Sequence, residues 1–181
     1  MMQVMRDTGQ AHYRVSDDCD ARLRAIAPDD ARRLIALFHR LSDETIRYRF
    51  FIAKKELLPS EAEHFASVDY RLRMAVVAEC ATTPERALVG VARYDASQSP
   101  DAERAEFAIV VEDRFQGRGL GKVLLRQLAE AARANGIRYL AGSTLADNQN
   151  MLRFLRGCGY PVEFQRDGTE MQFVIRLDNG G

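Results

Sequence analysis

A glycine-rich turn between an apolar run and an amphipathic segment constrains this chain most. Residues 116–121 read Gln-Gly-Arg-Gly-Leu-Gly. The apolar run at 107–111 predicts a buried strand, and the spacing of leucines over 122–135 predicts a helix. This order lets backbone N–H groups face an anion at the start of the helix, since glycine has no Cβ to hold a ligand away. A tight turn without a ligand is the alternative interpretation.

Two familiar phosphate-binding loops do not fit this turn. A dinucleotide fingerprint would need glycine where Lys122 stands, and a P-loop would need glycine at Gln116 and a hydroxyl residue at Val123. The pattern that fits is Gln/Arg-x-x-Gly-x-Gly/Ala, with Gln116, Gly119 and Gly121 in the fixed places. In these residues the chain resembles the GNAT family of N-acetyltransferases. The resemblance implies that the loop binds the pyrophosphate of acetyl-CoA.

Composition favours one domain without a broad charged surface. The chain has 181 residues, 46% apolar and 29% charged, with zero net charge. We expect a flexible lead-in at 1–19 and a single domain at 20–178. Neutral charge argues against nucleic-acid binding, and no run reaches the roughly 18 apolar residues of a membrane helix. Without a signal peptide at its start, the chain is expected in the cytoplasm, away from membranes.

The cysteines favour a reducing compartment. Cys19, Cys80 and Cys158 are odd in number and far apart in the sequence, which is not typical of a disulfide framework. No CxxC motif or Cys/His cluster indicates a metal, and none is expected. Cys80 and Cys158 are expected to be small buried residues rather than acyl carriers.

The order of predicted elements gives the fold class. It is strand, helices, three strands, helix, strand, helix and two strands, at 21–26, 28–41, 42–51, 59–67, 74–80, 88–94, 104–111, 122–135, 137–143, 148–156, 162–165 and 170–177. This predicts an α/β (α+β) domain with a mixed, mostly antiparallel sheet and helices on both faces. The GNAT fold has the same order.

A second segment strengthens the resemblance, which covers residues of about 20–178. Residues 145–160 look like the family's second ligand segment, where an asparagine opens a helix that ends in Gly-Tyr. The chain is most similar to the catalytic domain of bacterial protein-lysine acetyltransferases. The resemblance implies these acetyl-CoA contacts: Ile109, Val110, Val111, Gln116, Gly117, Arg118, Gly119, Leu120, Gly121 and Asn148. Many members carry a tyrosine as general acid where this chain has Leu155.

A carboxylate on the strand before the loop is the candidate general base. Acetyl transfer needs a neutral amine, and a lysine in water is almost wholly protonated at pH 7. Glu106 lies in an otherwise apolar strand, where burial would raise its pKa, and similar enzymes use a glutamate near this place. The alternative is a solvated glutamate at the sheet edge. Glu79, at another strand end, could share or replace this role.

The expected reaction is direct transfer of an acetyl group from acetyl-CoA to a primary amine, most similar to protein-lysine acetylation. The alternatives are a small-molecule amine acetyltransferase of the same fold and a non-catalytic acyl-CoA sensor. The arginine- and aromatic-rich group at 47–51 could line a substrate pocket or pack on the core. The chain could be a monomer or a homodimer.

Overall fold

The computed structural model describes residues 11–83, 85–99, 101 and 103–177. An 8-stranded sheet forms its centre, in the order β1-β2-β3-β4-β5-β6-β8-β7. The strands are β1 Ala11–Ser16, β2 Cys19–Ala25, β3 Arg73–Cys80, β4 Leu88–Asp95, β5 Arg104–Val111, β6 Tyr139–Leu145, β7 Val162–Asp167 and β8 Glu170–Arg176. Only β5 and β6 pair in parallel among the described strands. The predicted mixed, mostly antiparallel sheet is confirmed.

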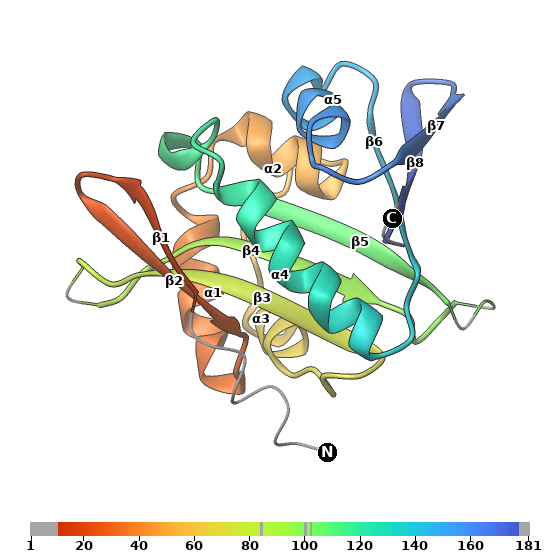
Figure 1. The fold of residues 1–181 in the computed structure, drawn as a ribbon. Coiled ribbons are helices and arrows are strands. Elements are labelled where there is room, and N and C mark those ends of the chain that lie inside the picture. The colour runs from red at the N-terminus through yellow and green to blue at the C-terminus, as the bar shows by residue number, and fades with distance from the viewer. Residues whose placement is uncertain (1–10, 84, 100, 102, 178–181) are drawn as a thin grey trace.

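Helices cover both faces of the sheet (Figure 1). One face carries α4, Leu120–Ala134, whose Leu120, Leu124 and Leu128 recur at helical spacing and are fully buried. The other face carries α1 Ala31–Phe38 and α3 Pro59–Ala66, which enclose a second apolar cluster. The remaining helices are α2 Asp43–Phe50 and α5 Gln149–Arg156, with short 3-10 turns at Pro28–Asp30 and Asp113–Phe115. No helix in the described ranges is both long and apolar enough to span a membrane.

The N-terminal segment corrects one expectation. The predicted lead-in at 1–19 is wrong for 11–19, because β1 and the start of β2 form a hairpin there. Tyr13 and Val15 pack toward the core. His12 and Arg14 are exposed. The two-residue alternation of a strand was therefore present in the sequence. The rest of that expectation, at 1–10, lies outside the described residues.

The cysteines correct another expectation. Cys19 and Cys80 form a disulfide between β2 and β3, with their Cα atoms 5.5 Å apart. Antiparallel pairing of these strands brings together residues 61 positions apart, which spacing in the sequence could not reveal. Cys158 is free and buried, as expected.

The central strands β5 and β6 separate part-way along their length. Their pairing ends at Glu106 and Ala141. Beyond that point β5 pairs only with β4, and β6 only with β8. Gly142 lies where the strands part, and a Cβ there would meet the Phe107 carbonyl oxygen at 3.0 Å and the Phe173 ring at 2.8 Å. The sheet therefore contains a gap bordered by two strands.

Candidate active site

The gap between β5 and β6 is the centre of the candidate site. Along it, the backbone groups of 107–111 and 142–145 that point into the gap have no partner across it in the described strands. Unpaired backbone N–H and C=O groups inside a sheet favour an extended ligand that carries amides of its own. Ile109, Val110 and Val111 are partly accessible along this border, and their contact with the co-substrate stays a prediction.

The glycine-rich turn lies at one end of the gap and presents several backbone N–H donors. Gly117 and Gly119 have φ angles of 71° and 84°, which a residue with a Cβ adopts only under strain, and Gly119 caps α4. The N–H groups of residues 117 and 119–121 donate to no backbone carbonyl in the described part of the chain. Together with the positive end of α4 they make a site for an anion. Arg118 is exposed beside it.

Two side chains from distant parts of the chain hold this turn in place. Gln116 Nε2 donates to the Val111 carbonyl at 3.0 Å and to Thr45 Oγ1 at 3.2 Å. The Tyr13 hydroxyl donates to the carbonyl of Arg118 at 2.7 Å. The amide hydrogens of Gln116 are therefore used inside the protein. Sequence analysis missed Tyr13 and Thr45, because only the folded chain brings them to the turn.

The start of α2 is fixed to the residues that precede the turn. Asp113 accepts hydrogen bonds from Ser42 Oγ at 2.6 Å, from Thr45 Oγ1 at 2.7 Å and from the Ser42 N–H at 2.9 Å. Burial would raise the pKa of Asp113, but these bonds outweigh it and lower the pKa. The loop and α2 are thus one connected unit, and α2 contacts both β5 and β6.

The far end of α2 meets the start of α5. Arg47 forms an ion pair with Asp147 at 3.0 Å. Asn148, next in the chain, is buried: its Oδ1 accepts from the Met151 N–H at 3.0 Å and its Nδ2 donates to Thr144 Oγ1 at 3.1 Å. Asn148 is therefore a helix cap. Its predicted contact with the co-substrate stays a prediction.

Glu106 lies at the last paired position before β5 and β6 separate. It shares a face with Ala108 and Val110, the face that α1, α2 and α3 cover. Contrary to the expected burial, its side chain is exposed. An exposed carboxylate beside the gap can accept a proton directly or through a water. Its role as base stays a prediction.

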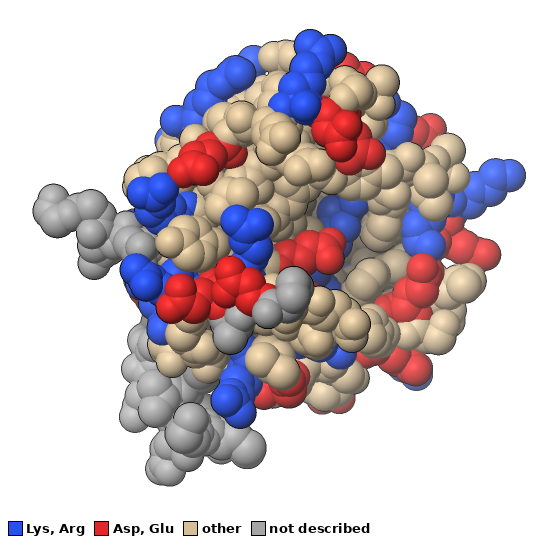
Figure 2. Space-filling view, turned by 90° about the vertical axis from the view of Figure 1, so that its right-hand side faces the viewer, with Lys and Arg blue, Asp and Glu red and all other residues tan. Residues whose placement is uncertain are grey.

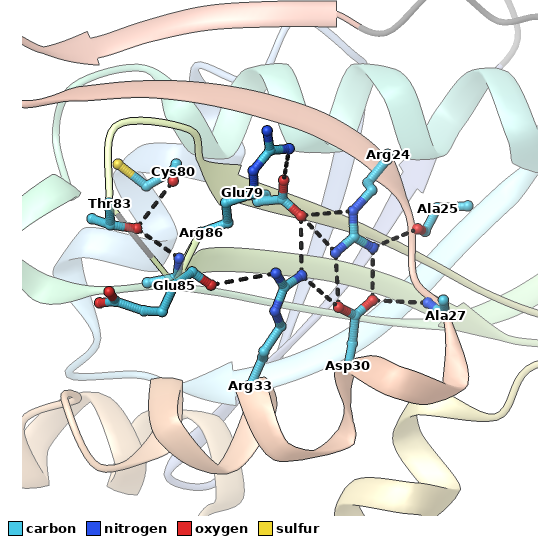
Figure 3. A network of polar contacts seen from close by, with 11 residues as sticks. Arg24, Ala25, Ala27, Asp30, Arg33, Glu79, Cys80, Thr83, Glu85 and Arg86 are labelled. Atoms are coloured by element: carbon cyan, nitrogen blue, oxygen red, sulfur yellow. Dashed lines mark hydrogen bonds and ion pairs between the residues drawn. The ribbon is translucent and has the colours of Figure 1, made fainter.

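Glu79 belongs to a different part of the molecule (Figure 3). This buried carboxylate accepts from Arg24 at 2.9 Å, from Arg33 at 3.0 Å and from Arg86 at 3.3 Å. Burial would raise the pKa of Glu79, but the arginines lower it on balance. Asp30 joins the same network through Arg24 at 2.7 Å. A carboxylate held by three guanidinium groups is a poor base.

The sheet register also separates the two glutamates. Their partners on β4 are Leu88 for Glu79 and Asp95 for Glu106. These partners lie at opposite ends of β4, roughly 23 Å apart at about 3.3 Å per residue. The structure therefore does not bring Glu79 to the gap, and the prediction that it shares the role of base is not supported.

The C-terminal half of the site offers no tyrosine where many GNAT enzymes have one. Leu155 is fully buried. Tyr160 packs against the core, and the Arg133 guanidinium lies 5.5 Å from the centre of its ring. In the described ranges, no cluster of His, Cys, Asp or Glu is arranged to hold a metal ion.

Comparison with known proteins decides the family. The model of the acetyltransferase (GNAT) family matches residues 38–160, which include β5, the glycine-rich turn, α4 and α5. The chain belongs to the GNAT family. It is an N-acetyltransferase by this membership, and its sheet and helices have the GNAT arrangement.

The chain is similar to other acetyltransferases in sequence and in structure. "Acetyltransferase PA5475" from Pseudomonas aeruginosa is 33% identical over 153 residues, which are 84% of this chain and 80% of that protein. The crystal structure of the GNAT domain of S. lividans PAT has a TM-score of 0.81 and 29% identity, covering 92% of this chain and 96% of that one. The structure of yncA from Salmonella typhimurium with its cofactor acetyl-CoA has a TM-score of 0.69 and 16% identity, covering 88% and 95% of the two chains.

Proposed function

We propose that this chain transfers an acetyl group from acetyl-CoA directly to the primary amine of a protein lysine, with Glu106 as the general base. The observation that carries the proposal is the position of Glu106. It stands where the gap begins, on the same strand that runs to the glycine-rich turn. Strand β5 thus carries the candidate base and leads to the turn that would bind the anion.

The residues around the gap fit acetyl-CoA. The N–H groups of residues 117–121 would hold its pyrophosphate, and Arg118 would add positive charge. The open edges of β5 and β6 would pair with the amides of its pantetheine arm. The structure of yncA with acetyl-CoA supports this use of the fold. Bound acetyl-CoA supplies the activated acetyl group.

Glu106 then has a defined task. The lysine ammonium must lose a proton before its nitrogen can attack the thioester carbonyl, and Glu106 accepts that proton, directly or through a water. After the attack the nitrogen is positively charged, and it loses its second proton to water. Collapse of the tetrahedral intermediate breaks the carbon–sulfur bond, and the thiolate leaves with the electron pair. Since Leu155 has no hydroxyl, water supplies a proton to the thiolate.

Two other functions compete with this proposal. A small-molecule amine acetyltransferase would use the same loop and base. An acyl-CoA sensor would need the loop but not a carboxylate at position 106, so the position of Glu106 beside the gap favours an enzyme.

The test has two parts. Acetyl-CoA at millimolar concentration should raise the melting temperature, because a ligand that binds only the folded state stabilises it. Lysine peptides incubated with the protein and acetyl-CoA should gain acetyl groups, read by mass spectrometry. A melting shift without acetylation of any peptide or small amine would support a sensor. No shift at all would overturn the proposed site.

A further inference from the structure

The face of the sheet that carries Glu106 holds an unusual pair of arginines. Arg93 on β4 lies directly opposite Ala108, with Ala75 on its other side. Arg49, from the end of α2, lines the same pocket, whose walls come from α1, α2, α3, β4 and β5 and are otherwise apolar. The two guanidinium groups lie over the Phe50 and Phe65 rings, 5.0 and 4.5 Å from the ring centres.

Neither arginine is neutralised by a close carboxylate in the described part of the chain. Arg93 donates to the Phe65 carbonyl at 3.0 Å, which leaves most of its donors unused. Asp95, the nearest acid along β4, attracts Arg93 electrostatically, but it forms its ion pair with Arg73, at 3.4 Å. Glu106 attracts Arg49 electrostatically without a hydrogen bond to it.

The environment penalises these unpaired charges. Burial, with repulsion from Arg49 and Arg73, lowers the pKa of Arg93 to about 9. Burial also lowers the pKa of Arg49, against the attraction of Glu106. Lys54, a further cation near this pocket, is already paired with Glu61 at 2.8 Å. Partly desolvated cations without a partner are costly unless an anion joins them.

We propose that this pocket binds a carboxylate carried by the amine acceptor, with Arg49 and Arg93 as its ligands and apolar walls around it. The inference rests on the proposed acetyltransferase function, and it names the class of acceptor. The carboxylate can belong to an acidic residue beside the acceptor lysine or to a small amino acid-like molecule. Either source would place the amine near Glu106, on the same face.

A local pocket is needed because the surface itself offers little selectivity. Figure 2 shows acidic and basic side chains mixed over one face of the molecule, with a hollow between them. The net charge of the chain is zero. A mixed surface gives weak long-range attraction, so discrimination between acceptors must come from specific contacts.

Two pairs of acceptors test the proposal. One pair is a lysine hexapeptide with glutamate or with glutamine beside the lysine, and the other is an ω-amino acid and the alkylamine of the same length. We expect kcat/KM to favour the carboxylate member by about ten-fold or more in at least one pair, mainly through KM. The pair that shows the preference identifies the source of the carboxylate.

Substitutions of the two arginines test whether this pocket causes the preference for acceptors that carry a carboxylate. Arg49→Gln and Arg93→Gln should each reduce it several-fold, whereas Arg32→Gln, an equal charge change at an exposed position on α1, should keep it. Acetyl-CoA binding by each variant, measured by calorimetry, reports that it is folded. Equal use of charged and neutral acceptors by an active wild-type enzyme overturns the carboxylate pocket and leaves the acetyltransferase function standing. Failure of every acceptor, with no binding of acetyl-CoA, overturns both.

Discussion

The hydroxyl of Tyr13 donates a hydrogen bond of 2.7 Å to the carbonyl of Arg118, across 105 residues of sequence. The first described strand therefore fixes the turn that is expected to bind the pyrophosphate of acetyl-CoA. A turn fixed before binding loses less conformational freedom when the ligand arrives.

Tyr13→Phe should weaken acetyl-CoA binding without unfolding the protein. A hydrogen bond of this kind contributes about 0.5–1.5 kcal/mol, so calorimetry should find the dissociation constant raised about two- to ten-fold. Tyr139→Phe is the matched control, because the Tyr139 hydroxyl has no hydrogen-bond partner in the described ranges. An unchanged constant in Tyr13→Phe would show that the turn does not need this contact.

Gly119→Ala should lower both stability and acetyl-CoA affinity. A Cβ at Gly119 would lie 2.5 Å from the Tyr13 hydroxyl oxygen, and its φ of 84° is strained for alanine. Gly117→Ala is the comparison: its φ is 71°, but the space for its Cβ is empty. Thermal melts of both should show the larger loss for Gly119→Ala.

The clash at Gly119 can be separated from the backbone strain. In Tyr13→Phe/Gly119→Ala the oxygen is gone, and the nearest ring carbon is 3.5 Å from the added Cβ. The double variant should therefore be more stable than the sum of the two single losses indicates. Additive losses would mean that the strained φ alone accounts for the effect of Gly119→Ala.

Glu79→Gln should destabilise the protein strongly and leave the catalytic rate of folded molecules unchanged. Removing one member of a buried ion-pair network costs about 3–5 kcal/mol, measured by urea unfolding at pH 7. A lower catalytic rate without a loss of stability would instead indicate that Glu79 takes part in catalysis.

The cost of Glu79→Gln should depend on pH in a defined direction. The pKa of Glu79 and that of Asp30 are lowered in the folded protein, so their stabilisation is present above their unfolded values, near pH 4. It is lost as the pH falls through the lower folded values. Unfolding free energies of wild type and variant should therefore converge as the pH drops below about 4. A difference that stays constant with pH would exclude an ionised Glu79.

Much of the fold could be predicted because its signals are local. Leu120, Leu124 and Leu128 mark α4 by spacing alone, and the expected strands lie within a few residues of the observed ones. The hairpin of β1 was missed because its polar residues mask the alternation of Tyr13 and Val15.

The site was only partly predictable, because its contacts depend on register. Nothing near Glu79 in the sequence identifies Arg24 as its partner, since antiparallel pairing of β2 and β3 joins residues 55 positions apart. The exposure of Glu106 was not predictable from the strand pattern, which places it among apolar residues. The same limit hid the role of Arg93, which stands near the end of a mostly apolar strand.

The measurement that tests the central claim most directly is a pH series of steady-state rates for wild type and Glu106→Gln with one lysine peptide. A general base contributes about 10²–10⁴-fold, so the variant should be slower by a factor in that range at pH 7 and should bind acetyl-CoA as wild type does. Its rate should recover partly as the pH rises, because more of the acceptor amine is then neutral. Glu63→Gln, an exposed glutamate on α3, should match wild type throughout. A wild-type rate for Glu106→Gln at neutral pH would contradict the assignment of Glu106 as the base.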